Sequence, residues 1–316
     1  ETDPGLRAKI TSAEQAALLV EDGMTVGMSG FTRAGDCKSV PAALAARAER
    51  EPLSITLITG ASLGHDTDKM LAQANALSRR MPFQVDTTLR RKINQGDIAF
   101  IDQHLSETVE QLRAGHIGPI NVAIIEAAAI TESGAIVPTM SVGNSASFAQ
   151  QADKIIIELN IGVPAAIEGL HDIYVPEDRP ARQPIGLVSV DQRIGQPFIE
   201  VDAAKIAAIV ITHEPDSPSN ALPPGFESSD FDNLTMYSEV LQDSAIELLD
   251  QGKLAFASAS SITGPSPCTT RSWPISTTIA NASCCVRRKS AMRPRSSAAW
   301  ASSESTRRWN SISTAT

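Results

Sequence analysis

Val122-Ala123-Ile124-Ile125-Glu126-Ala127 is the stretch that decides the fold, because it is almost continuously apolar rather than alternating between apolar and polar residues. A strand with one face in water alternates, whereas a strand of a parallel sheet covered by helices is apolar on both faces. The run therefore predicts a strand buried on both sides within a parallel sheet.

Similar runs occur before and after it, and helical stretches separate several of them. The strand-like runs cover residues 24–28, 55–59, 98–101, 155–159 and 206–212, and the helical stretches include 16–20 and 108–114. Pro41 precedes a further helical stretch, at the first turn, where helices tolerate proline. This alternation predicts an α/β fold with an open, layered parallel sheet.

Capping signals mark two of the predicted helices. Thr11-Ser12-Ala13-Glu14 has the spacing of a capping box, and Gly23 fits the end of the helix that follows. Ser244 and Glu247 form a second box of this kind, and that helix is expected to end near Gly252.

The composition is typical of a globular protein: 316 residues, a formal charge of −9 and 20% charged residues. An acidic chain is not expected to bind nucleic acid by neutralising phosphates. No run approaches the ~18 apolar residues that a membrane helix requires, and no signal-peptide pattern opens the chain. Four cysteines do not suggest a disulfide scaffold, so the predicted location is the cytoplasm.

Residues 264–316 differ from the rest, because they carry a charge of +7 and leave −16 for residues 1–263. They contain 19 Ser and Thr, three of the four Cys, all three Trp and no Leu. One interpretation is a disordered basic tail that touches nucleic acid or membrane. Disordered tails are usually poor in Trp and Cys, so we favour the alternative, translation in a shifted reading frame.

The loop Ser29–Asp36, Ser-Gly-Phe-Thr-Arg-Ala-Gly-Asp, joins a predicted strand to a predicted helix. Its backbone N–H groups could cradle an anion. The loop matches neither the P-loop nor the dinucleotide-binding fingerprint. On these residues alone, a tight turn without a binding role is the favoured interpretation.

Other polar features carry little chemistry by themselves. Gly143–Ser147, Gly-Asn-Ser-Ala-Ser, imitates a nucleophile elbow but lacks its final glycine, so a polar loop is favoured. The histidines lack metal spacing and none pairs with a cysteine, so no metal site is expected. They are His65, His104, His116, His171 and His213. The vicinal Cys284-Cys285 lie within residues 264–316 and receive no functional role.

The segment from Pro215 to Gly225 is rich in proline and serine and predicts a linker. A short strand at residues 234–237 and a helix follow, so Glu239 is expected just past the strand and before the helix. Ligand chemistry in open α/β sheets gathers at such carboxyl ends of strands. An arbitrary glutamate at the beginning of a helix is nevertheless more often a solvated or capping residue.

Five longer stretches together resemble the acetyl-CoA hydrolase/transferase family, the class I CoA-transferases that include succinyl-CoA:acetate CoA-transferase. They are Ser29–Asp36, Ile58–Gly64 (ITGASLG), Ile125–Ser145, Glu168–Tyr174 (EGLHDIY) and Asn233–Asp243 (NLTMYSEVLQD). The similarity extends over nearly all of residues 6–263.

The resemblance implies two related α/β domains in an open, layered parallel-sheet CoA-transferase fold. It implies no metal or other cofactor, with a coenzyme A thioester as substrate. The glutamate of the family's Tyr-Ser-Glu-Val segment is the catalytic nucleophile, and by that match the role falls on Glu239. The expected intermediate is a glutamyl-CoA thioester, which an acceptor carboxylate converts to a new acyl-CoA. Water that intercepts an activated acyl intermediate makes the same site a hydrolase.

The resemblance also implies the substrate residues and the partners. Gly30, Phe31 and Thr32 of the first loop, with Gly143 and Asn144, are expected to form part of the acyl pocket. The expected partners are acyl-CoA and small carboxylates, and a second copy in a homodimer of the intact family member. Neither nucleic acid nor a membrane is expected.

The second half of the chain departs from the family. Two glycine-rich segments associated with CoA binding are absent, one of them between the linker and Asn233. Codons can be chosen for residues 267–312 that, read one nucleotide out of phase, spell a continuation of the family's sequence. We therefore expect a complete N-terminal domain at 1–220 and a fragment of the C-terminal domain at 221–263. Residues 264–316 are expected to be a frameshift product.

Two functions of different classes remain open at this point. The first is a CoA-transferase, or an acetyl-CoA hydrolase, that uses Glu239. The second is a catalytically inactive α/β remnant that at most binds a ligand or a partner. The acyl group is open as well.

Overall fold

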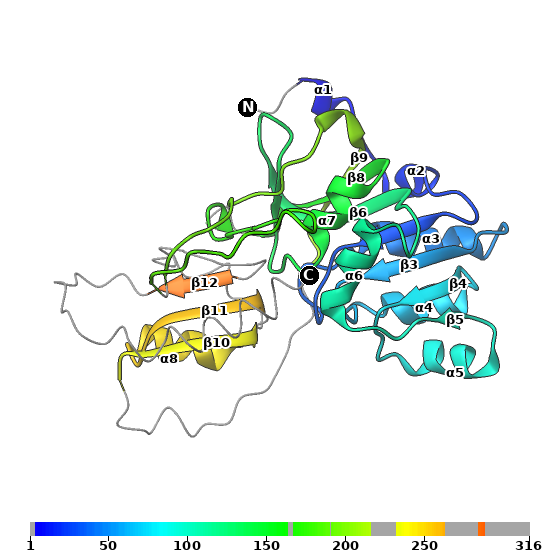
Figure 1. Cartoon of the computed structure of the whole chain (residues 1–316). Coiled ribbons are helices and arrows are strands. Elements are labelled where there is room, and N and C mark those ends of the chain that lie inside the picture. The colour runs from blue at the N-terminus through cyan, green and yellow to red at the C-terminus, as the bar shows by residue number, and fades with distance from the viewer. Residues whose placement is uncertain (1–3, 164–166, 190, 216–231, 263–283, 288–316) are drawn as a thin grey trace.

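Two units of unequal size make up the described part of this computed structural model, which covers residues 4–163, 167–189, 191–215, 232–262 and 284–287. The larger unit lies within residues 4–215 and is built on one sheet. The smaller unit consists of residues 232–262 and 284–287 and lies beside it (Figure 1).

The sheet of the larger unit has the order β1-β9-β8-β6-β2-β3-β4-β5, and every pairing along this path is parallel. Only β7 is antiparallel, and it pairs with β6. The strands are β1 (Ile10–Thr11), β2 (Thr25–Met28), β3 (Ile55–Thr59), β4 (Leu77–Met81), β5 (Ala99–Phe100), β6 (Val122–Ile130), β7 (Ile136–Pro138), β8 (Lys154–Asn160) and β9 (Ile206–Thr212). The predicted α/β fold with a parallel sheet is confirmed.

The order of the strands places a switch point between β2 and β6. From β2 the chain moves outward through β3 and β4 to β5, and it then returns to β6 on the other side of β2 and continues outward to β8 and β9. In open α/β sheets, ligands bind outside the carboxyl ends of the strands at such a point. The loops that follow β2 and its neighbours are therefore the first place to look for a site.

Helices cover both faces of this sheet (Figure 1). They are α1 (Pro4–Arg7), α2 (Ala13–Ala17), α3 (Ser39–Ala48), α4 (Thr67–Gln73), α5 (Thr87–Gln95), α6 (Leu105–Arg113) and α7 (Ser145–Gln151), with a 3₁₀ turn at Ala203–Lys205. On β6, Val122 and Ile124 join one buried cluster with Leu44 of α3, and Ile125 joins a second with Phe148 of α7. Burial of each such side chain stabilises the fold by about 1.5–3 kcal/mol. Because both faces of β6 are buried, the run is apolar along its length.

The smaller unit contains β10 (Leu234–Leu241), α8 (Asp243–Asp250), β11 (Leu254–Ile262) and β12 (Cys284–Arg287). β10 and β11 are parallel, and β12 is antiparallel to β11. Its buried cluster includes Leu249 and Phe256 but also Ile167 and Leu170 of the larger unit. The backbone N–H of Ile262 also donates to the carbonyl of Met140 at 3.0 Å, so the smaller unit is packed against the larger one.

The two predicted capping boxes are displaced. Ser12 rather than Thr11 precedes α2, and its hydroxyl accepts a hydrogen bond from the N–H of Gln15 at 3.2 Å, whereas Thr11 belongs to β1. α8 begins before Ser244, which therefore lies inside the helix and does not cap it. Gly252 follows the end of α8 with φ +80°, so the predicted end of that helix is confirmed.

Other boundaries also differ from the sequence prediction. The strand predicted at 234–237 extends to residue 241, so Glu239 lies within β10 rather than just past it. Residues 145–147 form the first turn of α7 instead of a polar loop. The strand predicted at 98–101 is reduced to Ala99–Phe100.

Several expectations fall on residues outside the described part. These residues include 216–231 of the linker region and 263–283 and 288–316 of the basic segment. Residues 284–287 are the described part of that segment, as strand β12. The domain boundaries and the shifted reading frame therefore remain predictions.

Candidate active site

The loops after β2 and β3 lie against each other at the switch point. The N–H of Thr32 in the first loop donates to the carbonyl of Ser62 in the second at 3.1 Å. Gly30 has φ +125°, and a Cβ there would lie 2.6 Å from the Cβ of Asp36. A Cβ at Gly60 would lie 3.2 Å from the carbonyl oxygen of Gly30. The positive φ and the 2.6 Å contact favour glycine at position 30, and a Cβ at position 60 would require the backbone of the first loop to shift slightly.

The turn between β7 and α7 is the third part of this region. A Cβ at Gly60 would lie 3.4 Å from the amide nitrogen of Asn144, and one at Gly143 would lie 3.6 Å from the ring of Phe31. The fold therefore brings together four of the residues that the sequence analysis selected, Gly30, Phe31, Gly143 and Asn144. We call Gly30–Phe31, Gly60 and Gly143–Asn144 the glycine cradle.

Polar groups without partners lie in and beside the glycine cradle. Three buried side-chain atoms have no hydrogen-bond partner among the described residues: Thr32 Oγ1, Asn144 Nδ2 and Ser145 Oγ. Within the described part of the chain, no hydrogen bond uses the N–H of Gly30, Gly143 or Asn144. Buried polar groups are normally paired, so these atoms are available to a bound ligand.

The beginning of α3, immediately after the first loop, already holds an anion from the protein itself. Glu158 of β8 is fully buried, and its carboxylate accepts hydrogen bonds from the N–H groups of Lys38, Ser39 and Val40 at 2.8, 3.1 and 2.6 Å. Burial raises the pKa of Glu158, while these three bonds oppose that shift. The N–H groups at the beginning of α3 are therefore occupied, and the expectation that the backbone of Ser29–Asp36 cradles an anion remains a prediction.

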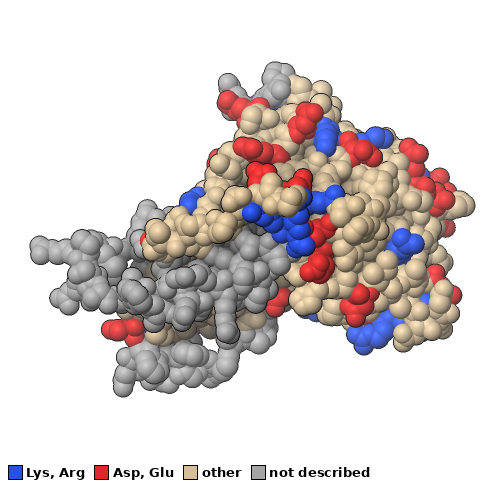
Figure 2. Space-filling model, in the orientation of Figure 1, with Lys and Arg blue, Asp and Glu red and all other residues tan. Residues whose placement is uncertain are grey.

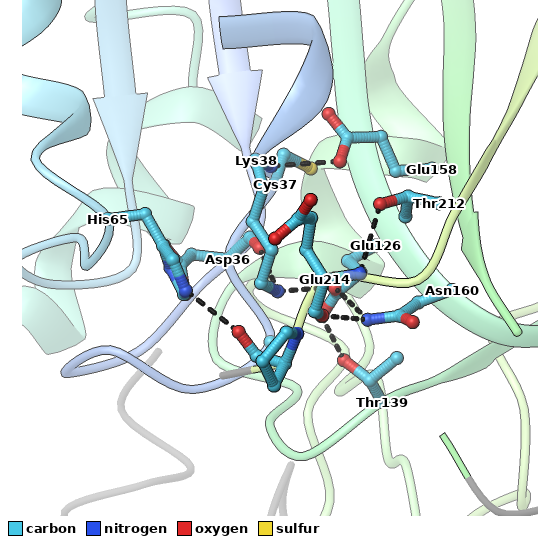
Figure 3. A network of polar contacts seen from close by, with 12 residues as sticks. Asp36, Cys37, Lys38, His65, Glu126, Thr139, Glu158, Asn160, Thr212 and Glu214 are labelled. Atoms are coloured by element: carbon cyan, nitrogen blue, oxygen red, sulfur yellow. Dashed lines mark hydrogen bonds and ion pairs between the residues drawn. The ribbon is translucent and has the colours of Figure 1, made fainter. Parts of the chain in front are cut away.

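A second buried carboxylate, Glu126, lies beside Glu158, because the two residues are paired in register on β6 and β8. Figure 3 shows the network around it. Glu126 accepts from Lys38 Nζ at 2.5 Å, from Thr139 Oγ1 at 2.5 Å and from Asn160 Nδ2 at 2.9 Å. Lys38 also donates to the carbonyl of Asp36 at 2.8 Å. These bonds fix the end of the first loop to the sheet.

The second loop is fixed by a fully buried arginine. Arg80 of β4 forms two hydrogen bonds to the carboxylate of Asp68, at 2.8 and 3.1 Å, and donates to Thr59 Oγ1 at 2.9 Å. Thr59 in turn donates to the carbonyl of Ala61 at 2.5 Å. A bidentate pair of this kind has a well-defined geometry, so Arg80 fixes the backbone next to Gly60 through Thr59.

Asp36 and His65 connect the two loops. Nδ1 of His65 lies 2.9 Å from Oδ2 of Asp36, and Nε2 lies 2.9 Å from the carbonyl oxygen of Pro215, after β9. The hydrogen bond to Asp36 raises the pKa of His65. The neighbouring Cys37 is fully buried, and its burial raises the pKa of the thiol well above its usual range. This burial disfavours the thiolate, which is the nucleophilic form of cysteine.

Glu239 belongs to the smaller unit. It is exposed on β10, and none of the described hydrogen bonds or ion pairs joins it to the cradle. The connection is indirect: β10 pairs with β11, and Ser261 of β11 forms an isolated bridge with Ser141, two residues before Gly143. The role of Glu239 therefore remains a prediction.

No metal cluster or membrane helix is found in the described part. Its residues contain no group of three or more His, Cys, Asp or Glu side chains that could hold a metal ion. Among the same residues, no helix is long and apolar enough to cross a bilayer. Acidic and basic side chains are interspersed on the face of the larger unit in Figure 2.

The sequence analysis missed Gly60 and the buried charges around Lys38. Gly60 lies in a stretch that carried the family resemblance, and its position directly after a predicted strand was the available signal. Glu126 and Glu158 each interrupt an apolar strand, which indicates a buried charge with a partner. Nothing in the sequence identified Lys38 as that partner, because it lies 88 residues from Glu126.

Comparison with known proteins gives a consistent result. The sequence model for the acetyl-CoA hydrolase/transferase N-terminal domain matches residues 5–211. The succinyl-CoA:acetate CoA-transferase of Clostridium kluyveri is 37% identical, with 83% of this chain and 57% of that protein covered. The propanoyl-CoA:succinate CoA transferase of Escherichia coli is 34% identical (80% and 61% covered), and the acetyl-CoA hydrolase of Schizosaccharomyces pombe is 37% identical (81% and 61% covered).

The chain spans about three fifths of the length of these relatives. The alignment with the Clostridium protein extends over 308 positions, yet 83% of 316 residues is about 262. The relative therefore carries residues inside the matched range that have no counterpart in this chain. This agrees with the segment expected to be absent before Asn233.

Solved structures show the same fold. RipA from Yersinia pestis has a TM-score of 0.57 at 15% identity, with 82% of this chain and 64% of that chain covered. The 4-hydroxybutyrate CoA-transferase from Porphyromonas gingivalis has a TM-score of 0.51 at 15% identity (82% and 63% covered).

Proposed function

Because the chain belongs to the acetyl-CoA hydrolase/transferase family, we propose that it carries the chemistry of an acyl-CoA:carboxylate CoA-transferase, with Glu239 as the nucleophile. The substrates in this proposal are acetyl-CoA or succinyl-CoA and acetate or a similar small carboxylate. The names of the relatives support these substrate classes. A coenzyme A thioester is the substrate, and the proposed reaction needs no further cofactor.

The proposed reaction transfers CoA from the donor acyl group to an acceptor carboxylate by way of Glu239. The Glu239 carboxylate attacks the acyl-CoA carbonyl and expels CoA thiolate, which leaves a mixed anhydride. The thiolate attacks the glutamyl carbonyl of this anhydride, which releases the free carboxylate and leaves a glutamyl-CoA thioester. An acceptor carboxylate then repeats the two steps in reverse and leaves as the new acyl-CoA.

The observation that carries the proposal is the glycine cradle with its unpaired donors. A carboxylate is a weak nucleophile, so each tetrahedral oxyanion needs preorganised hydrogen-bond donors. The N–H groups of Gly30, Gly143 and Asn144 are without protein partners in the described part of the chain and lie at the switch point of the sheet. Buried charges hold the loops on both sides, so such donors would need little reorganisation during the reaction.

Two alternatives have specific support. Hydrolysis of acetyl-CoA is favoured by the names of several relatives, including that of Schizosaccharomyces pombe. An inactive fragment is favoured by the length of the chain, which covers only about three fifths of those relatives. The glycine cradle would serve transfer and hydrolysis equally, because both reactions pass through the same type of oxyanion.

One assay separates the three possibilities. The chain is incubated with acetyl-CoA, with and without labelled succinate, and both labelled succinyl-CoA and free CoA thiol are measured. A transferase forms succinyl-CoA and releases little thiol, whereas a hydrolase releases thiol without an acceptor. Loss of either activity in Glu239→Gln, with activity retained in the exposed control Glu247→Gln, supports the proposal. If the wild-type chain forms neither product, the chain is an inactive fragment.

A further inference from the structure

Asp36, His65 and Pro215 bring together three separate segments of the chain, and Figure 3 shows Asp36 and His65 side by side. Asp36 ends the loop after β2, His65 follows the loop after β3, and Pro215 follows β9. The two ring nitrogens of His65 lie 2.9 Å from Oδ2 of Asp36 and 2.9 Å from the carbonyl oxygen of Pro215. Asp36 is fully buried, whereas the His65 side chain is 23% exposed.

The number of protons in this arrangement follows from the partners. The carbonyl oxygen of Pro215 can only accept, so Nε2 of His65 carries a hydrogen. The contact between Nδ1 and Oδ2 of Asp36 requires a second hydrogen, which an imidazolium donates to a carboxylate. Both bonds therefore exist together only when the pair holds both protons, with His65 as an imidazolium.

Asp36 touches the glycine cradle directly. A Cβ at Gly30 would lie 2.6 Å from the Cβ of Asp36, and a Cβ at Gly64 would lie 3.1 Å from its Oδ2. A rotation of the Asp36 side chain would therefore change the contact of Oδ2 with Gly64, in the segment after β3. Among the described residues, Oδ1 of Asp36 is buried and has no hydrogen-bond partner, so the described contact that orients this carboxylate is the one with the imidazole of His65.

The charged groups around His65 come from each segment that packs there. The segment between β2 and α3 contributes Arg33, Asp36 and Lys38, and the charge of Lys38 faces Glu126 at 2.5 Å. In the segment that contains His65, Nζ of Lys69 lies 3.2 Å from Oδ2 of Asp66. Glu214 precedes Pro215 in the third segment. The carboxylate of Asp36 is in hydrogen-bond contact with the ring of His65.

We propose that Asp36 and His65 are positioning residues, and that the imidazolium of His65 holds the β2 and β3 loops of the glycine cradle in their binding geometry. This arrangement is intact at low pH. It is lost as the pH rises through the pKa of His65, because the neutral ring can donate only one of the two hydrogen bonds.

The sign of the pH effect can be checked from linkage. The bond to Asp36 raises the pKa of His65 above its ordinary value of 6.5. A group with a raised folded-state pKa contributes stability that is complete below the unfolded pKa and is lost as the pH rises through the folded one. The loops should therefore be best ordered below pH 6.5 and loosen above it.

Hydrogen exchange of the full chain at pH 6 tests the positioning role. The hydrogen bond from the N–H of Thr32 to the carbonyl of Ser62 joins the two loops and reports their contact. We expect peptides that cover residues 29–36 and 58–66 to exchange about tenfold faster in His65→Gln than in the wild type. In the double variant, which also carries Asp36→Asn, these peptides should exchange no faster than in His65→Gln alone. His116→Gln, which changes an exposed histidine, should leave both peptides unchanged. Unchanged exchange in His65→Gln, or additive effects of the two substitutions, would overturn the proposal.

An NMR titration of the histidine side chains measures the titration midpoint of His65, which a purely structural role would leave at its ordinary value. The resonance of His65 is assigned by its absence from His65→Gln. Its midpoint should lie above 6.5 in the wild type and shift downward in Asp36→Asn. A midpoint at the ordinary value in the wild type would contradict the proposal.

Ligand binding is the part of this inference that rests on the proposed function. The affinity for acetyl-CoA should fall as the pH rises through the pKa of His65, and the same profile should be flat in His65→Gln. If the wild-type chain binds no acetyl-CoA at any pH, the proposed function fails, while the exchange and NMR results still decide the positioning role. A pH profile identical in the wild type and His65→Gln counts against the positioning role.

Discussion

The larger and the smaller unit hold their functional residues in different ways. In the larger unit, the glycine cradle is supported from below by buried carboxylates and by a buried arginine, on a sheet covered on both faces. In the smaller unit, Glu239 is exposed on β10, whose only sheet partner among the described residues is β11. The proposed donors are thus preorganised, whereas the proposed nucleophile is carried by a unit that shares its core with Ile167 and Leu170 of its neighbour.

The largest expected effect concerns the cores of the two units. Phe256 and Phe148 are both buried, in the smaller and the larger unit respectively. Truncation to alanine should cost about 3–5 kcal/mol at each position. We expect Phe256→Ala to raise hydrogen exchange in residues 234–262 only, and Phe148→Ala to raise it throughout the sheet of the larger unit. Equal exchange of all strands in Phe256→Ala would show that the two units unfold as one.

The buried carboxylates should matter more than exposed ones. Glu158→Gln removes the negative charge that accepts three backbone N–H groups at the beginning of α3. We expect a loss of about 2–4 kcal/mol in the free energy of unfolding, measured by urea denaturation. The control is Glu51→Gln, because that side chain is 50% exposed and should change the stability by less than about 0.5 kcal/mol. Equal losses would mean that the buried network adds nothing.

A smaller effect is expected when the glycine cradle is narrowed. A Cβ at Gly60 would lie 3.2 Å from the carbonyl oxygen of Gly30, and valine adds two further methyl groups there. We expect Gly60→Val to weaken acetyl-CoA binding about tenfold, which is about 1.4 kcal/mol, in a calorimetric titration. Gly186→Val is the matched control, since nothing lies within 4 Å of a Cβ at that position. Unchanged affinity in Gly60→Val would exclude the cradle as the binding site.

The smallest expected effect is a pH dependence at His171 and Asp172. Burial lowers the pKa of His171 to about 4 and raises the pKa of Asp172 to about 6. The contribution of His171 to stability is complete above pH 6.5 and is lost as the pH falls toward 4, and that of Asp172 runs in the opposite direction. The two should offset each other between pH 4 and 6.

The substitution His171→Asn separates these two contributions. The difference in stability between the wild type and this variant should grow as the pH rises from 4.5 to 6.5, measured by urea denaturation at each pH. A difference that stays constant with pH would show that His171 is not held neutral by its burial.

The fold was predictable from the sequence because its signal is local. The runs at 55–59 and 206–212 coincide with β3 and β9, since a strand buried on both faces must be apolar along its whole length. The position of Glu239 was not, because β10 continues four residues beyond the predicted strand, where it pairs with Ala259 to Ile262 of β11. That pairing is a tertiary contact that no local pattern in β10 reveals.

The site was predictable only in part, for a similar reason. Gly30 and Gly143 carried a signal through the family resemblance, and the fold brings them together. The contacts of Lys38 with Glu126 and Glu158 join segments 88 and 120 residues apart. Such contacts depend on the order of the strands, which the sequence of apolar runs does not specify.

The most direct test of the account is to trap the proposed intermediate on Glu239. The chain is incubated with acetyl-CoA, treated with borohydride, digested and mapped by mass spectrometry. A glutamyl-CoA thioester is reduced to a primary alcohol, so the account predicts a modified Glu239 in the peptide that covers β10, and no such peptide without acetyl-CoA. An unmodified Glu239 from a chain that turns over acetyl-CoA would contradict it.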